Sequence, residues 1–252
     1  MKNIVDFNKK HIMVVGASSV GIKTAETICK LGARVDIADV NIQDVDRIID
    51  SFDGHENHSF YLNVSNANSI ADSIGDACER FGKYDGLFYT ANVVKRIMLS
   101  DCYVEEIKKQ FEVNFYSFYE TVRQLTVQGR YNSGMRIVSI SSVSSLKGIE
   151  SYAAFSASKA AMDSAIKTMA IELAPKGICI NSIIAGFIKS QFYEEYKNSI
   201  EEDDISFRIF KERQFMGVGE AQDIANIAAF LLSDASKFFT GQSIVADGGY
   251  SS

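Results

Sequence analysis

The first forty residues alternate between short apolar runs and helical patterns. His11–Val15 is rich in β-branched residues and ends at the turn Gly16–Gly21, after which apolar residues recur at helical spacing as far as Leu31. A short, continuous apolar run is typical of a strand buried in a parallel sheet, and in such folds a turn leads into a covering helix. The pattern therefore favours a fold in which parallel strands alternate with helices.

The turn after the first strand predicts a binding site for a phosphate. Backbone N–H groups at the start of a helix converge on an anion, and the helix dipole favours negative charge there. The residues expected to form this cradle are Gly16, Ser18, Ser19 and Gly21. One glycine turn is a weak signal, but the next apolar run ends at Asp39, near the place where dinucleotide-binding folds hold a ribose hydroxyl.

The same alternation continues to the end of the chain. No repeat, low-complexity segment or linker interrupts it, so a single doubly wound domain is expected. Further strands are predicted at 60–62, 86–89, 135–140 and 177–184, and further helices at about 67–81, 103–128 and 152–174.

Composition narrows the class of ligand. The 252 residues carry a formal net charge of −6, whereas nucleic acids and anionic membranes are bound by basic surfaces. We therefore expect a small organic ligand, with neither nucleic acid nor a membrane as partner. The sequence shows no signal-peptide or membrane-span pattern and its cysteines have no paired spacing, which favours a cytoplasmic protein with reduced thiols. His55 and His58 lie in a polar stretch without a third ligand, so we predict a solvated loop and no metal site.

The segment from Ser142 to Lys159 resembles the active-site segment of short-chain dehydrogenases/reductases. That family has a serine after a buried strand and a Tyr-x-x-x-Lys pair on the next helix. Ser142 and Lys159 match the serine and the lysine, but Phe155 stands at the tyrosine position. The end of the chain, through Asp247–Tyr250, is nearly the closing signature of the family. The resemblance extends over essentially the whole chain and implies a Rossmann-like α/β fold with a doubly wound, seven-stranded parallel sheet in one domain, residues 1–252.

The resemblance also implies roles for individual residues. Asn114 would interrupt a long helix so that a water can link the active-site lysine to the interior. Ser142 would hydrogen-bond the reacting oxygen, and Lys159 would hold the nicotinamide ribose. The further positions that it places beside the cofactor are Asn63, Val64, Ala91 and Ile188. Residues 187–216 correspond to the family's substrate cover, although a packed pair of helices would explain their aromatic content equally well.

Phe155 lacks the hydroxyl that serves as general acid in the family. Three explanations stay open: an introduced substitution, a natural homologue that binds ligand without turnover, and an enzyme whose proton comes from another residue. The alternative donor is Tyr152, seven residues and thus two helical turns before Lys159. A packing role for Tyr152 at the start of the helix is the favoured interpretation.

Two functions follow from these observations. The first is an NAD(H)-dependent oxidoreductase that acts on an alcohol or ketone and is impaired by the missing tyrosine. The second is a non-catalytic nucleotide-binding homologue with a regulatory or partner-subunit role. We predict NAD as the cofactor because Asp39 would repel the 2′-phosphate of NADP, and no Arg or Lys stands at positions 38–41 to attract it.

The resemblance further implies a homotetramer. The helix predicted at 103–128 carries more aromatic surface than packing on one sheet face would cover, which favours contact with another subunit. The residues concerned are Phe115, Phe118, Tyr119 and Val122.

Overall fold

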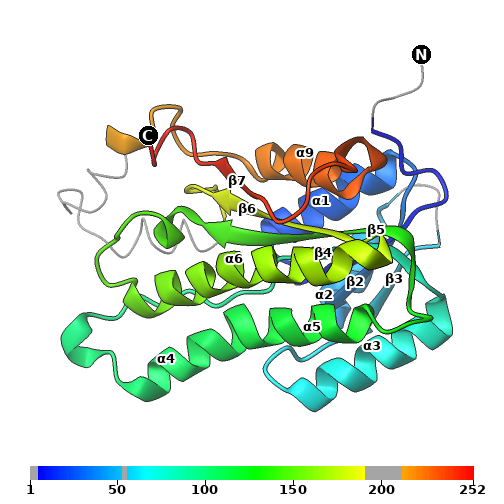
Figure 1. Cartoon of the computed structure of the whole chain (residues 1–252), viewed down its shortest axis with the longest axis horizontal. Helices are drawn as coiled ribbons and strands as arrows, with labels where there is room; N and C mark the ends of the chain where they lie inside the picture. The colour runs from blue at the N-terminus through cyan, green and yellow to red at the C-terminus, as the bar shows by residue number, and fades with distance from the viewer. Residues whose placement is uncertain (1–4, 53–55, 191–211) are drawn as a thin grey trace.

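The structure, a computed structural model, describes residues 5–52, 56–190 and 212–252. In this part of the chain seven parallel strands form one sheet in the order β3-β2-β1-β4-β5-β6-β7 (Figure 1). The strands are β1 His11–Val15, β2 Arg34–Asp39, β3 His58–Tyr61, β4 Tyr84–Tyr89, β5 Tyr131–Ser142, β6 Cys179–Ala185 and β7 Ser243–Ala246. The direction of the strand order reverses between β1 and β4. In doubly wound sheets, ligands bind at the carboxyl ends of the strands beside such a reversal.

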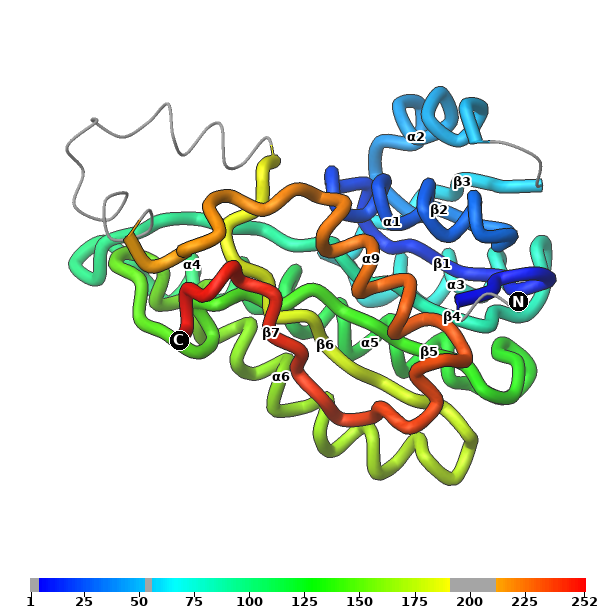
Figure 2. Tube along the Cα trace, turned by 90° about the horizontal axis from the view of Figure 1, so that it is seen from above, coloured from blue at the N-terminus to red at the C-terminus, as the bar shows by residue number. Residues whose placement is uncertain are grey.

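Helices cover both faces of the sheet, as Figures 1 and 2 show. Those of one face are α1 Ser19–Lys30, α2 Ile42–Ile49 and α9 Ala221–Leu232. Those of the other face are α3 Ala67–Phe81, α4 Val104–Phe111, α5 Ser117–Leu125 and α6 Ala153–Leu173. The predicted doubly wound, seven-stranded fold is thereby confirmed. None of the helices that the structure describes is long and apolar enough to cross a membrane.

Strand β1 shows why the apolar runs are continuous. Met13 and Val15 belong to the core beneath α5 and α6, whereas Ile12 and Val14 belong to the core beneath α1 and α9. All four side chains are fully buried. Because successive side chains of a strand point to opposite faces, a strand covered on both sides needs apolar residues at every position.

The helix predicted at 103–128 is divided. α4 and α5 are joined by the π-helical turn Glu112–Tyr116, which contains Asn114. A π turn inserts one extra residue into the helix and is frequent at functional sites. The interruption expected at Asn114 is therefore present.

The solvated loop predicted around His58 is wrong for this residue. His58 begins β3, its Nδ1 lies 3.2 Å from Oδ1 of the fully buried Asp36, and its ring stacks on Phe81. His55 lies outside the described residues. None of the four cysteines, all of which lie in the described part of the chain, forms a disulfide.

The contact surface predicted on the 103–128 helix is wrong in part. Phe118 and Val122 are buried in the core of the single chain, so they leave no apolar surface for a partner. The exposed rings on this segment are Tyr103, Tyr116 and the predicted Tyr119, at 69%, 52% and 48% exposure. The tetramer itself stays a prediction.

Candidate active site

The turn between β1 and α1 is shaped by two glycines that no larger residue could replace without movement. Gly16 has a φ of +98°, and a Cβ on it would lie 2.6 Å from the amide nitrogen of Ala91. A Cβ on Gly21 would lie 2.2 Å from the carbonyl oxygen of Gly16. The residue predicted beside the cofactor at position 91 thus supports the glycine turn from behind, and its N–H donates to the carbonyl of Val15.

Serine side chains define the start of α1. Ser18 is the N-cap, and its Oγ accepts a hydrogen bond from the amide of Gly21 at 3.1 Å. The same Oγ lies 2.6 Å from Oγ1 of Thr90, which ties the turn to the end of β4. The amides of Ser19 and Val20 open the helix and have no intrahelical acceptor, and both residues line a pocket. This arrangement can bind an anion.

Asp39 ends β2 and faces the glycine turn. Its Oδ2 accepts from the amide of Ala17 at 2.7 Å, and its Oδ1 accepts from the amide of Asn41 at 3.0 Å. Each carboxylate oxygen has a second lone pair, so the group can still accept hydrogen bonds from two further donors. Its position at the carboxyl end of β2 suits a ribose.

Asn63 and Val64 follow β3 at the same edge of the sheet. The side chain of Asn63 accepts from the amide of Ser65 at 3.0 Å, and Val64 packs against the core. Neither side chain lines the pocket that begins at Ser19. Their predicted contact with a cofactor stays a prediction.

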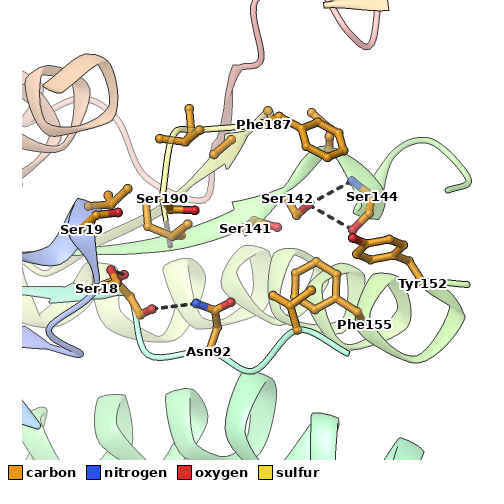
Figure 3. A pocket seen from close by; sticks show the side chains of 18 of the residues that line it. Ser18, Ser19, Asn92, Ser141, Ser142, Ser144, Tyr152, Phe155, Phe187 and Ser190 are labelled. Atoms are coloured by element: carbon orange, nitrogen blue, oxygen red, sulfur yellow. Dashed lines mark hydrogen bonds between the residues drawn. The ribbon is translucent and has the colours of Figure 1, made fainter. Parts of the chain in front are cut away.

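The pocket at the carboxyl edge of the sheet has a volume of about 580 Å³. It runs from the start of α1 past the end of β5 to the start of α6, and Figure 3 shows its side chains. Of the predicted site residues, those that line it are Ser18, Ser19, Ser142, Phe155 and Ile188. Further lining residues that the sequence did not single out are Thr90, Asn92, Val94, Ser144, Ile149 and Phe187.

Ser142 ends β5 and is held by Ser144, two residues further along the chain. Its Oγ accepts a hydrogen bond from the amide of Ser144 at 3.2 Å and a second one from the Ser144 hydroxyl at 3.1 Å (Figure 3). Ser141, one residue earlier, points its hydroxyl instead at the carboxylate of Asp163, at 2.7 Å. The two adjacent serines therefore belong to different networks.

Lys159 lies one turn after Phe155 on α6 and is buried. Its ammonium group donates to the carbonyl of Ile140 at 2.9 Å and stands 5.8 Å from the centre of the Phe155 ring. Burial lowers the pKa of Lys159 to about 8, against the opposing charge of Asp163, which raises it. An ammonium group has three donors, so two remain for a ligand.

Asp163 organises the segment around Lys159. It accepts hydrogen bonds from the hydroxyls of Ser141, Ser145 and Ser182, at 2.7 to 2.8 Å. These three serines come from β5, from the turn after it and from β6. A buried carboxylate needs such partners, and here they fix the end of β5, which carries Ser142.

Asn114 is fully buried, as expected, and its side chain is occupied by protein partners. Oδ1 accepts from the amide of Val93 at 2.8 Å, while Nδ2 donates to the carbonyl of Val93 and to Oγ of Ser158, at 2.9 and 3.0 Å. It therefore joins the π turn to α6 beside Lys159. The water link to the lysine stays a prediction.

Tyr152 packs at the start of the helix, as the favoured interpretation expected, and it also lies on the pocket wall. It is the N-cap of α6 and is 5% exposed, but it lines the pocket together with Ser142 and Phe155. Its ring meets that of Phe155 edge to face, with centroids 5.9 Å apart, and Arg96 lies 6.0 Å from its centre. Packing and a place in the site are thus combined in one residue.

The fold and this pocket define a doubly wound α/β protein with a candidate ligand site, because the pocket opens at the switch point of the sheet beside a helix start. The family model described as enoyl-(acyl carrier protein) reductase matches residues 14–251. The chain is 27% identical over 254 residues to a cyclohexanol dehydrogenase of Acinetobacter sp. (strain SE19), covering 98% of this chain and 96% of that protein. It is 29% identical over 249 residues to a 3-oxoacyl-(acyl-carrier-protein) reductase of Escherichia coli (strain K12), covering 97% and 98%.

Solved structures agree with these matches. A dehydrogenase/reductase from Sinorhizobium meliloti 1021 superposes with a TM-score of 0.89 at 25% identity, over 98% of this chain and 97% of that one. A short chain oxidoreductase from Pseudomonas aeruginosa PAO1, described as containing an atypical catalytic center, has a TM-score of 0.87 at 22% identity, which is a likeness of fold. It covers 97% of this chain and 98% of that one. The chain belongs to the short-chain dehydrogenase/reductase family.

Proposed function

We propose that this protein is an NAD(H)-dependent oxidoreductase that interconverts an apolar alcohol and its ketone. The observation that carries the proposal is the continuity of the pocket. One cavity joins the amides at the start of α1 to the Ser142 hydroxyl and the Phe155 ring. A nucleotide at one end would therefore place its reactive ring near a carbonyl group at the other.

The residues present suit a nicotinamide dinucleotide. The amides of Ser19 and Val20 would bind the phosphates, Asp39 would accept from the adenosine ribose, and the two remaining donors of Lys159 would bind the second ribose. The bound cofactor would supply or accept a hydride. Ser142 would hold the oxygen of the substrate, as its position on the pocket wall allows.

The substrate end of the pocket supports a neutral, apolar substrate. Val94, Ile149, Phe155 and Phe187 line it, and among the described lining residues none carries a charge. A charged substrate would leave its charge without a partner there, at a large cost. The relative from Acinetobacter bears the name cyclohexanol dehydrogenase, and cyclohexanol with cyclohexanone is accordingly the first pair to try.

Cofactor choice is tested by titration. NADH and NADPH are titrated against the protein while nicotinamide fluorescence is recorded, with Asp39→Ala as the variant. NADH should bind more tightly, because Asp39 repels a 2′-phosphate, and the variant should narrow the difference. Equal or tighter binding of NADPH by the unmodified protein would contradict the assignment of NAD.

Catalysis is tested separately on a panel of alcohols and ketones that includes cyclohexanol and cyclohexanone. Slow turnover is expected, since loss of a positioned general acid costs about 10²- to 10⁴-fold. Tight NADH binding with no turnover of any panel member, even by Phe155→Tyr, would favour the non-catalytic homologue. The tetramer and the cytoplasmic location remain parts of this proposal, and light scattering at micromolar concentration tests the first.

A further inference from the structure

Reduction of a ketone needs a proton as well as a hydride, and Phe155 has none to give. If the proposed function holds, another group in the pocket must protonate the oxygen. Tyr152 packs its ring edge to face on Phe155, and the serine hydroxyls near that end belong to Ser141, Ser142 and Ser144. Their hydrogen bonds distinguish them.

Ser141 is excluded by its partner. Its hydroxyl donates to the carboxylate of Asp163 at 2.7 Å, and the residue is only 2% exposed. Charge-assisted bonds of this kind are the strong ones, so its hydrogen is committed to Asp163. Ser145 donates to the same carboxylate at 2.8 Å and is excluded for the same reason.

Ser142 accepts hydrogen bonds from Ser144, whereas Ser141 and Ser145 donate theirs to Asp163. A serine hydroxyl has two acceptor lone pairs and one hydrogen. The amide and the hydroxyl of Ser144 both donate to its oxygen, at 3.2 and 3.1 Å. Both lone pairs are therefore occupied, and the hydrogen of Ser142 remains for a group in the pocket. Ser142 can therefore donate its hydrogen to the carbonyl oxygen of a ligand in the pocket.

We propose that Ser144 and Ser142 form a two-step proton relay that replaces the missing phenol. Hydride adds to the carbonyl carbon, and the electron pair of the broken π bond moves to the oxygen. That oxygen takes the proton of Ser142, Ser142 takes the proton of Ser144 along their hydrogen bond, and Ser144 recovers a proton from water. In the oxidative direction each transfer runs in reverse. This assignment rests on the proposed function.

The first test measures turnover of cyclohexanone with NADH. Ser144→Ala should lower kcat by about 10²-fold, at the low end for loss of a positioned proton donor, because the Ser144 amide still holds Ser142. Ser144→Thr keeps a hydroxyl and should retain the rate. Ser164→Ala is the control: it removes the hydroxyl of an exposed serine on α6 that does not line the pocket, and it should change the rate little.

The second test places the substitution in another background. In Phe155→Tyr the phenol can protonate the oxygen directly, so adding Ser144→Ala should leave its rate unchanged. The solvent isotope effect supplies a further check. With mixtures of H₂O and D₂O the rate should follow a curve for two protons in the unmodified protein, and a straight line for one proton in Phe155→Tyr.

The third readout does not depend on turnover. Cyclohexanone bound together with oxidised NAD cannot be reduced, and its carbonyl stretch can be recorded by infrared difference spectroscopy. Donation from Ser142 should move the band to lower wavenumber, and Ser144→Ala should reduce the displacement. Ser142→Ala should abolish it.

The outcomes separate the relay from the proposed function. An equal rate and an equal carbonyl band in Ser144→Ala and the unmodified protein would overturn the relay while leaving the oxidoreductase in place. Turnover by Phe155→Tyr alone would also overturn it. A protein that binds neither NADH nor cyclohexanone would overturn both proposals.

Discussion

Lys159 should lower the stability of the protein at neutral pH, and replacing it by methionine makes this measurable. Burial lowers its pKa from 10.5 to about 8. At about 1.36 kcal/mol per pKa unit, this corresponds to a cost of about 3 kcal/mol for keeping the charge in the folded state. Lys159→Met removes the charge but leaves the Ile140 carbonyl without its donor, which costs about 1–3 kcal/mol. The pH dependence is therefore clearer than the absolute change.

The sign follows from proton binding. Because the pKa of Lys159 is lower in the folded state than in the unfolded state, the unfolded chain holds more protons between about pH 8 and pH 10.5. Stability conferred through this group rises with pH across that window, as the cost of the charge is relieved. From pH 7 to about pH 9.5 the unmodified protein should gain about 2 kcal/mol relative to Lys159→Met.

Urea unfolding at the two pH values measures this difference. Far-UV circular dichroism is the suitable signal, since the chain contains no Trp. Lys167→Met, which removes an exposed lysine from the same helix, serves as the control and should show no such change. If Lys159→Met differs from the unmodified protein by the same free energy at both pH values, the charge of Lys159 is not buried as described.

Two further substitutions test the parts of the fold that surround the site. Gly21→Ala would bring a Cβ within 2.2 Å of the Gly16 carbonyl oxygen. Urea unfolding should show that the free energy of unfolding falls by about 1–3 kcal/mol, and the NADH titration should show weaker binding. Gly148→Ala, whose Cβ meets nothing within 4 Å, should show neither effect. Burial opposes ionisation of Asp36, but hydrogen bonds to His11 and Tyr84 prevail and hold its pKa below the usual value. Asp36→Asn should therefore lower the free energy of unfolding by about 3 kcal/mol at pH 7. The stabilisation by a carboxylate of lowered pKa is lost as pH falls through that pKa, so the difference in stability between the two proteins should shrink in acid. A constant difference down to about pH 3 would contradict this account.

The fold could be predicted because the sequence repeats one local signal. Every strand of the sheet interior is buried on both faces, so each appears as an apolar run, and a turn or helix start follows it. Element ends were less accurate. β5 begins at Tyr131, four residues before the apolar run at Met135, because its first residues are polar and still pair with β4.

The Asp36 network illustrates what local patterns do not contain. Asp36 stands inside an apolar run, and His58 stands in a polar stretch, so neither suggested a buried contact. The carboxylate has hydrogen-bonding partners from three other strands: His11 at 2.7 Å, Tyr84 at 2.6 Å and His58 at 3.2 Å. Sequence separations of 22 to 48 residues connect them. Only the order β3-β2-β1-β4 brings these four positions to one end of the sheet.

Pocket residues on a helix could be placed from helical spacing, whereas those positioned by a loop could not. Counting turns back from Lys159 placed Phe155 correctly, since both lie on α6. The same count fails for Tyr152, because the helix begins at Ala153. The preceding residue, Ser151, has a φ of +67°, a left-handed conformation that changes the direction of the chain. The orientation of the Tyr152 ring is therefore set by the turn between β5 and α6.

The same turn contains Ser144 and Ile149, and this explains why the chemistry at the Phe155 end is the least predictable part of the site. A family resemblance identifies positions on the strand and on the helix, where geometry is regular. The hydrogen bond from Ser144 to Ser142 instead depends on a 3₁₀ turn, Val143–Ser145, that Ser142 itself caps. The serine hydroxyls that line the pocket beside Phe155, those of Ser142 and Ser144, belong to this turn or to the strand end that caps it. Its serines are consequently where a substitute proton donor has to be sought.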